Sequence, residues 1–214
     1  KLVFRFEGDD TADTRLTAAD LSVFGPGPHL LHGGTLGLFR GTTAETLATA
    51  AERHDGLLSL DPNVRPQIIE DRDAWDHFHQ RWLGRTDLYK GSDEDFEWIW
   101  PGRTTDSITE ELLANGVTAV VVTRGGDGLT VTTAEGRVQA PAPVVDVVDT
   151  VGAGDTIVAT FLVSLAEDGV ATTEALAKVD TDRWQTMGRR AVEAAAVTCS
   201  RPGADTPHRS ELAW

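Results

Sequence analysis

The chain carries the sequence VDTVGAGD at residues 148–155, and the apolar stretch TIVATFL follows at residues 156–162. Gly152, Ala153 and Gly154 leave the start of a helix without bulky side chains, so the backbone N–H groups up to Asp155 can converge on one anion. The same field keeps the carboxylate of Asp155 ionised while it accepts a proton from an attacking hydroxyl. This pattern predicts phosphoryl transfer to an alcohol. The structural alternative is a glycine-rich loop that only caps a core helix.

Length and composition indicate one globular unit. The chain has 214 residues with 40% hydrophobic content, enough for one sizeable α/β core, so we expect residues 1–214 to form a single domain. No apolar run reaches membrane-spanning length, and no signal-peptide pattern opens the chain. The one cysteine, Cys199, excludes an internal disulfide and fits a cytoplasmic protein.

The charge balance narrows the range of partners. The chain has 19 basic and 34 acidic side chains, which gives a net charge of −15. Such an excess of negative charge argues against binding to nucleic acid or to anionic membranes. We therefore expect small-molecule partners, with any anionic ligand held by a local field.

Helical and strand patterns alternate along the chain, which predicts an α/β fold with a mostly parallel sheet. A hairpin is expected where Glu135 and Gly136 join two short apolar strands. The expected strands are 29–34, 57–60, 88–89, 117–123, 129–133 and 138–140. The expected helices are 42–54, 75–83, 94–98, 108–114, 155–165, 172–178 and 183–198.

Polar motifs follow several of these elements, at the edge where open α/β sheets bind ligands. They are DPNVRP at 61–66, KGSDED at 90–95, TRGGDG at 123–128 and CSRPGAD at 199–205. Each also has a purely structural interpretation: a proline turn, an acidic helix cap, a β-turn and the end of a helix, respectively.

The run DTVGAGD at 149–155, with its small apolar helix, resembles the C-terminal signature of the ribokinase-like (PfkB) carbohydrate kinases. The resemblance implies a three-layer α/β/α sandwich with a mostly parallel sheet. It also implies that Asp155 is the catalytic base, in contact with the substrate, and that the amides of Gly152, Ala153 and Gly154 form an anion hole. The motifs at 61–66, 92–95 and 200–204 are most similar to the fructokinase branch.

The resemblance extends to the substrate and the nucleotide phosphates. It implies that Arg65 clamps sugar or phosphate, while Asp61 and Asn63 order metal-bound water. The family's Asn-x-x-Glu pattern is replaced here by Ser92 and Asp95. By this correspondence, Ser92 contacts the nucleotide and Asp95 holds magnesium through water, with a shorter reach than glutamate.

Two further loops match the family's nucleotide and cation sites. Its Thr-x-Gly-x-x-Gly loop corresponds to Thr123, Gly125 and Gly128, which with Gly154 are the implied nucleotide contacts. A monovalent cation site, for potassium, is implied at Asp149, Val151 and Gly203.

The activity implied is transfer of the γ-phosphoryl group of ATP, with Mg²⁺, to a sugar hydroxyl. Fructose is the leading acceptor, and ketodeoxygluconate and ribose are the alternatives. The family's first strands, its lid and its Gly-Gly/Asn sugar motif have no counterpart in this sequence, so we expect a fragment or a natural truncation. A non-catalytic nucleotide- or sugar-binding remnant is the alternative of another class. Whether the protein forms a homodimer stays open, because the lid that commonly pairs subunits in this family has no counterpart in this sequence.

The remaining polar and aromatic residues favour structural roles. The six histidines show no zinc-like spacing with cysteine, and His77 and His79 fall on different faces of a helix. His32 lies near the predicted substrate edge, where packing or capping is the favoured role. The tryptophans expected in the core are Trp75, Trp82, Trp98 and Trp100.

Overall fold

The computed structural model describes residues 11–23, 29–34 and 36–214, which form a six-stranded β-sheet covered by helices. The strands lie in the sheet in chain order; β1 to β4 are parallel, and β5 and β6 are antiparallel. They are β1 (Leu30–Gly34), β2 (Leu57–Asp61), β3 (Leu88–Ser92), β4 (Ala119–Thr123), β5 (Leu129–Thr133) and β6 (Gly136–Ala140). The expected mostly parallel sheet and its terminal hairpin are both confirmed.

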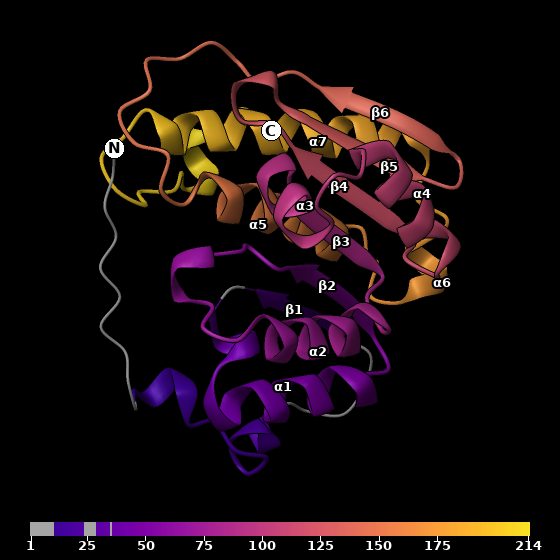
Figure 1. Ribbon diagram of the computed structural model, residues 1–214. Helices are drawn as coiled ribbons and strands as arrows, with labels where there is room; N and C mark the ends of the chain where they lie inside the picture. Colours follow the sequence, from indigo (N-terminus) through magenta and orange to yellow (C-terminus); the bar gives the residue numbers. More distant parts are fainter. Residues whose placement is uncertain (1–10, 24–28, 35) are drawn as a thin grey trace.

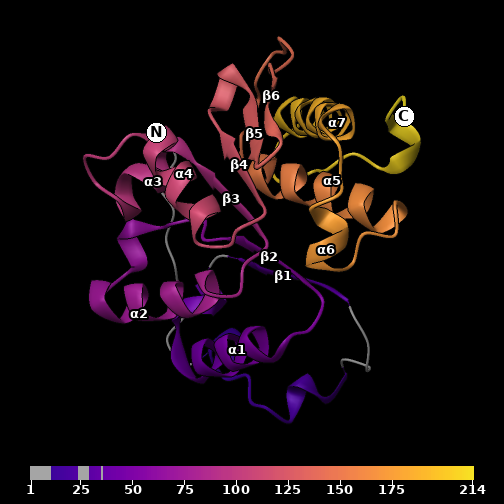
Figure 2. The same ribbon diagram turned by 90° about the vertical axis from the view of Figure 1, so that its right-hand side faces the viewer.

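Helices cover both faces of the sheet (Figure 1). Figure 2 shows α1 to α4 on one side of the strands and α5 to α7 on the other. The helices are α1 (Gly41–Arg53), α2 (Arg72–Leu83), α3 (Asp93–Ile99), α4 (Thr105–Ala114), α5 (Ala153–Glu167), α6 (Thr173–Leu176) and α7 (Thr181–Cys199). Short 3₁₀ helices are η1 (Ala12–Thr14), η2 (Asp20–Val23), η3 (Leu36–Phe39), η4 (Pro66–Ile68), η5 (Gly125–Asp127) and η6 (Arg209–Glu211). This arrangement confirms the three-layer α/β/α sandwich.

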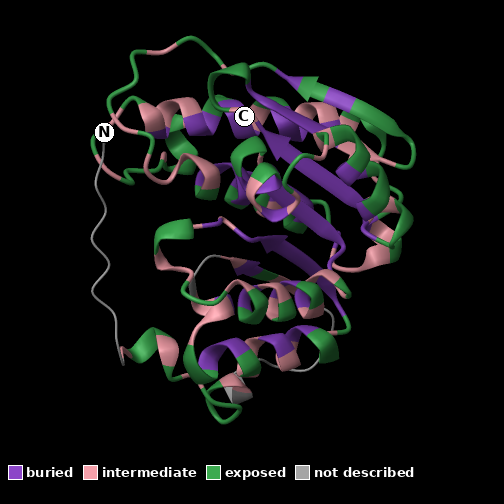
Figure 3. Ribbon diagram, in the orientation of Figure 1, coloured by how far each residue is buried: buried purple, intermediate pink, exposed green. Residues whose placement is uncertain are grey.

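Two hydrophobic cores hold the three layers together. On one side of the sheet, Leu57 and Val121 pack with Phe161 of α5. On the other side, Leu60 packs with Trp82 of α2. Figure 3 shows the central strands buried along their length. Burial of each large apolar side chain contributes roughly 1.5–3 kcal/mol to the stability of the fold. Because the strands pack into these cores, the cores also fix where the strands end.

Strand alternation decides which polar residues face α5. Successive side chains of a strand point to opposite faces of the sheet. In β2, Leu57 belongs to the core beneath α5 and α7, so Asp61 points to that layer as well. In β3, Leu88 belongs to the same core, which places Lys90 on the same face. The carboxyl-terminal half of this face is therefore polar, and the amino-terminal half is apolar.

Several elements are longer than the sequence predicted, β3 and α2 among them. β3 continues to Ser92 instead of ending at Tyr89, because Lys90 is accommodated by an acidic partner on β2. α2 begins at Arg72, earlier than expected, because the side chain of Asp71 accepts a hydrogen bond from the backbone and caps the helix.

Among the helices that the structure describes, none is long and apolar enough to cross a bilayer.

His79 on α2 is buried in a cluster of aromatic side chains. The residue is 1% exposed, and its ring stacks on Trp75 with 4.7 Å between ring centroids. Its Nε2 atom lies 3.1 Å from the hydroxyl oxygen of Tyr89. Burial lowers the pKa of His79 to about 3, and the nearby charge of Arg72 acts in the same direction. The imidazole is therefore neutral in the folded protein at neutral pH.

Acidification should destabilise the protein through His79. In the unfolded chain this side chain takes up a proton below about pH 6.5, whereas in the folded protein it stays neutral down to about pH 3. The unfolded state binds more protons in this window, so the contribution of His79 should lower the free energy of unfolding by about 2 kcal/mol between pH 7.5 and pH 5. Urea denaturation at both pH values measures the change. His79→Phe should remove this contribution and His77→Gln should keep it; an unchanged pH dependence in His79→Phe contradicts the assignment.

Candidate active site

α5 begins at a turn with left-handed backbone. Gly152 is the N-cap residue and has a φ of 81°, a conformation that glycine adopts without strain. No side chain caps this helix, and within the described part of the chain the N–H groups of Gly154 and Asp155 have no acceptor. Unpaired donors at a helix N-terminus carry the positive end of the helix dipole. The turn is therefore suited to hold an anion from outside the chain.

Two threonines hold this turn against α7. The Thr156 hydroxyl donates to the carbonyl oxygen of Gly152 at 2.8 Å, and it lies 2.9 Å from the hydroxyl oxygen of Thr198. Thr198 is fully buried near the end of α7. Donors that are fixed before a ligand arrives do not need to reorganise when charge develops on it.

Asp155 lies in the first turn of α5, and its side chain is exposed. His32 lies in the middle of β1, where desolvation lowers the pKa of the imidazole and the negative charge of Asp155 opposes this effect. Part of His32 is exposed at the edge of the sheet, and its Nδ1 atom lies 3.1 Å from the hydroxyl oxygen of Ser59. The structure thus brings Asp155 near His32, which forms a hydrogen bond within the sheet.

A cleft of about 660 Å³ opens beside the turn, at the carboxyl ends of β3 and β4. Every motif identified in the sequence contributes residues to it. The predicted site residues that line it are Asn63, Arg65, Ser92, Asp95, Thr123, Gly125, Gly128, Ala153 and Gly154. Lys90 and Cys199 line it as well. Gly152 and Asp155 flank these lining residues in the same turn, while Asp61, Asp149, Val151 and Gly203 lie outside the cleft lining.

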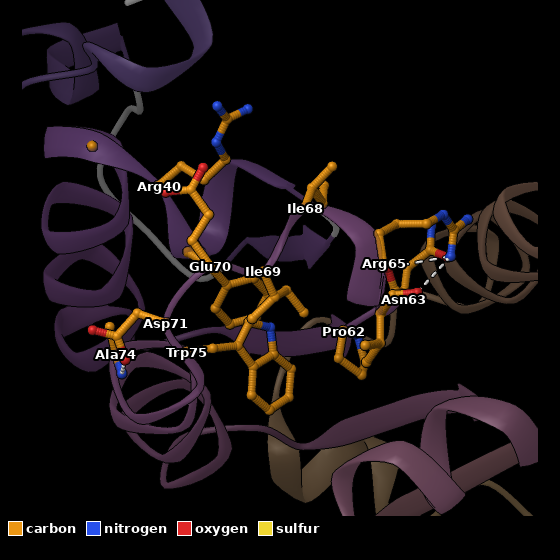
Figure 4. Close-up of a pocket in the computed structure, with 13 residues that line it drawn as sticks. Arg40, Pro62, Asn63, Arg65, Ile68, Ile69, Glu70, Asp71, Ala74 and Trp75 are labelled. Carbon is orange, nitrogen blue, oxygen red and sulfur yellow. Dashed lines mark hydrogen bonds between the residues drawn. The ribbon is translucent and has the colours of Figure 1, made fainter. Parts of the chain in front are cut away.

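The loop at 61–66 is held by its own polar groups. The Asp61 carboxylate accepts the N–H of Asn63 at 3.1 Å, and Asn63 has a positive φ of 39°. The Arg65 guanidinium donates to the carbonyl oxygens of Val64 at 2.9 Å and of Asn63 at 3.4 Å, as the dashed lines in Figure 4 show. Arg65 and Asn63 both line the cleft. Their contacts with a sugar stay a prediction.

Asp95 joins this loop to the start of α3. One of its carboxylate oxygens accepts the N–H of Val64 at 2.8 Å, and the other accepts the N–H and the hydroxyl of Ser92. Ser92 in turn accepts the N–H of Asp95, which completes a capping box. Both oxygens of Asp95 therefore have backbone partners, and its contact with magnesium through water stays a prediction.

The acidic residues at the cleft suit a hydrated magnesium ion. Asp93 and Glu94 also line the cleft, and carboxylate oxygens are ligands that Mg²⁺ accepts, directly or through water. In the described ranges, no group of three or more His, Cys, Asp or Glu residues could hold a metal alone. An ion here would take its other ligands from phosphate oxygens and water.

The residues of the predicted potassium site lie close together. The Asp149 carboxylate accepts the N–H of Val151 at 3.1 Å and the N–H of Gly203 at 3.0 Å. These two hydrogen bonds lower the pKa of Asp149. The carbonyl oxygen of Cys199 accepts the N–H groups of residues 148 and 149. The structure gives the three residues a shared structural role, and the cation stays a prediction.

The glycines of the loop at 123–128 have different roles. Gly128 has a φ of 90°, and a Cβ atom there would lie 2.1 Å from the carbonyl oxygen of Ala140, so the hairpin itself requires glycine. Gly125 has a φ of 48°, and a Cβ atom there would meet nothing within 4 Å. Gly125 therefore presents bare backbone to the cleft beside Thr123, as a nucleotide contact would need.

Comparison with protein families decides the relationship of this chain. Residues 4–211 match the model of the pfkB family carbohydrate kinases. The chain belongs to the pfkB family. The glycine turn and the helix that carry the family resemblance are therefore those of a pfkB family member.

Curated relatives and solved structures agree with this membership. A fructokinase from Rhizobium leguminosarum bv. trifolii is 35% identical over 179 residues, which are 83% of this chain and 55% of that protein. A fructokinase from Klebsiella pneumoniae is 31% identical over 97% of this chain and 68% of its own length. The chain thus spans about half the length of the first of these relatives.

Two solved structures share the fold. The aminoimidazole riboside kinase of Salmonella enterica, in complex with aminoimidazole riboside and an ATP analogue, has a TM-score of 0.77 at 24% identity, over 94% of this chain and 66% of that one. A fructokinase from Vibrio cholerae O395, bound to fructose, ADP and calcium, has a TM-score of 0.77 at 22% identity, over 91% of this chain and 62% of that one.

A second cavity borders the loop at 61–66 in this pfkB chain (Figure 4). It has a volume of about 280 Å³ and shares Asn63, Val64 and Arg65 with the larger cleft. Trp75 and Ile69 form part of its lining. The loop therefore lines two cavities, and its position affects both.

One residue of the cleft had no role in the sequence prediction. Lys90 appears in the motif at 90–95, but the short strand predicted at 88–89 ended before it. Extending the strand alternation from Leu88 would have placed Lys90 on the face that α5 covers. Its partner, Asp61, was predicted to order metal-bound water, whereas the structure buries it against Lys90.

Proposed function

We propose that this protein is an ATP-dependent sugar kinase that transfers the γ-phosphoryl group of ATP to a sugar hydroxyl, with fructose as the leading acceptor. One observation carries the proposal: the unpaired amide turn before α5 opens onto a cleft that also contains the Thr123 and Gly125 loop. A nucleotide along this cleft would direct its terminal phosphate toward the turn. The fructokinase relatives favour fructose over ribose and ketodeoxygluconate.

The chemistry requires few protein groups. Asp155 accepts the proton of the sugar hydroxyl as its oxygen attacks the γ-phosphorus, and the bond from that phosphorus to the β,γ-bridging oxygen of ATP breaks to release ADP. The N–H groups of Gly154 and Asp155 stabilise the charge on the equatorial oxygens of the transferred group. Mg²⁺, when bound, would neutralise charge on the nucleotide phosphates, and Asp93, Glu94 and Asp95 at the cleft could hold it through water.

The proposed potassium ion would act indirectly. Asp149 and Val151 lie directly before the turn, and the N–H of Gly203 donates to Asp149, so a cation held there would add positive charge behind the turn. Magnesium removal should abolish turnover, while potassium removal should only lower it. The single cysteine is consistent with the reducing cytoplasm as the compartment of this reaction.

A coupled assay of ATP consumption with fructose, ribose, ketodeoxygluconate and adenosine tests the proposal. We expect ADP release that depends on the sugar and a kcat/KM that is highest for fructose. A higher kcat/KM for another sugar would correct the substrate and leave the kinase intact. Binding of ATP without sugar-dependent ADP release would indicate the non-catalytic remnant instead.

The cysteine at the cleft provides a test of nucleotide binding. Cys199 is half-buried, it lines the cleft, and burial raises the pKa of its thiol. Labelling with a maleimide at pH 8 should therefore be slow, and we expect saturating ATP with Mg²⁺ to slow it at least about tenfold by covering the thiol. Mass spectrometry follows this single site. Fructose alone is the control and should leave the rate unchanged; equal rates with and without ATP would place the nucleotide elsewhere.

A further inference from the structure

Lys90 and Asp61 form a buried ion pair between β3 and β2. The ammonium group of Lys90 donates to a carboxylate oxygen of Asp61 at 2.7 Å. The two side chains are 7% and 3% exposed. Removing two charges from water costs several kcal/mol per ion, and apolar side chains of similar volume often stabilise such a position equally well. The pair therefore calls for an explanation beyond stability.

The ammonium group has capacity for a further partner. Lys90 has three N–H donors, and within the described part of the chain Asp61 is the acceptor that they reach. Lys90 lines the cleft, whereas Asp61 is buried and is not among the residues that line it. Two donors of a nearly buried cation are thus left for a group that enters the cleft.

The Lys90 ammonium group lies close to the turn before α5. A Cβ atom added to Gly154 would lie 3.1 Å from the Lys90 nitrogen, so the ammonium lies directly against the first turn of α5. Glycine at this position makes the approach possible. The positive charge of Lys90 and the unpaired N–H of Gly154 therefore act on the same small volume.

The other basic side chain at the cleft is poorly placed to contact a phosphate at this turn. Among the described residues that line the cleft, Arg65 and Lys90 are the basic ones. Arg65 donates to carbonyl oxygens of its own loop. In a chain with a net charge of −15, a local cation has particular value for an incoming polyphosphate.

We propose that Lys90 is a further catalytic residue, which donates to the phosphoryl group in transit, and that Asp61 is the positioning residue that holds its ammonium at the turn. This inference rests on the proposed kinase function. The charge that spreads over the equatorial oxygens in the transition state gives Lys90 a stronger interaction there than in the ground state. Loss of the ammonium should therefore lower kcat more than it changes the KM for ATP.

The decisive variant removes both charges at once. Lys90→Met alone would leave a buried carboxylate unpaired and risks unfolding, whereas Asp61→Asn/Lys90→Met leaves no buried charge. We expect this double variant to fold and to show a kcat on the order of 10²-fold lower, with a KM for ATP within about threefold of wild type. The matched control is Arg85→Met/Asp87→Asn, which removes the ion pair at the amino end of β3. The control should keep kcat.

The outcomes separate this inference from the proposed function. A wild-type protein without sugar-dependent turnover overturns both. An active wild type with a folded double variant of normal kcat overturns the role of Lys90 alone, as does a change confined to KM. Gly154→Ala is a second test that does not depend on the folding of the double variant, because alanine favours the helix and its methyl group would displace the ammonium. Its kcat should fall at least about tenfold, and an unchanged kcat contradicts the inference.

Discussion

Replacing Asp155 with asparagine should lower kcat by about 10³-fold while the KM for ATP stays within a few-fold of wild type. Asparagine keeps the size of the side chain but cannot accept the proton of the sugar hydroxyl. Asp155 is exposed in the first turn of α5, so the substitution disturbs no buried contact. Steady-state kinetics with the best sugar substrate measures the effect.

A second aspartate provides a control for Asp155→Asn, because it separates the loss of a charge at a helix N-terminus from the loss of the base. Asp182 is also exposed and also lies in the first turn of a long helix, α7. Asp182→Asn removes the same favourable interaction with a helix dipole, about 0.3–1 kcal/mol, without touching the cleft. Its kcat should match that of the wild type. An Asp155→Asn variant with a kcat within tenfold of wild type would exclude Asp155 as the base.

Gly152→Ala should lower kcat by about 10²-fold and also reduce stability. Alanine in the left-handed region costs about 1–2 kcal/mol. Its Cβ atom would lie 3.1 Å from the Cβ atom of Ala204, so the turn and the loop at 203–204 would have to separate. Such a shift would misalign the N–H groups of Gly154 and Asp155. Thermal unfolding and kinetics on the same preparation give both numbers.

Gly169 offers a matched control at the other end of α5. It has a φ of 72°, and a Cβ atom there would meet nothing within 4 Å. Gly169→Ala should therefore reduce stability by a similar amount, because alanine is strained in the left-handed backbone conformation, and should leave kcat unchanged. If the two variants lost stability equally and both kept full kcat, the geometry of the Gly152 turn would have no part in catalysis.

The parts of the fold that depend on local sequence could be predicted. The alternation of apolar strands and amphipathic helices gave the correct layers, since each element buries the face that its own period defines. The glycine turn before α5 was predictable for a similar reason: its left-handed conformation and its unpaired donors belong to the local sequence at residues 152–155.

The contacts that depend on register between strands could not be predicted in this way. Asp61 and Lys90 are far apart in the chain, and they meet because β2 and β3 lie side by side in parallel. The sequence motif gave Asp61 a role toward metal-bound water, and only the packed sheet reveals its partner. Asp95 is a similar case, since it accepts the N–H of Val64 and so joins two motifs that lie far apart in the sequence.

The most direct test is a crystal structure of the protein with a non-hydrolysable ATP analogue, Mg²⁺ and fructose. The account predicts that the terminal phosphate lies about 3 Å from the backbone nitrogens of Gly154 and Asp155, with a fructose hydroxyl between that phosphate and the Asp155 carboxylate. A terminal phosphate bound away from this turn, with Asp155 facing solvent, would contradict it.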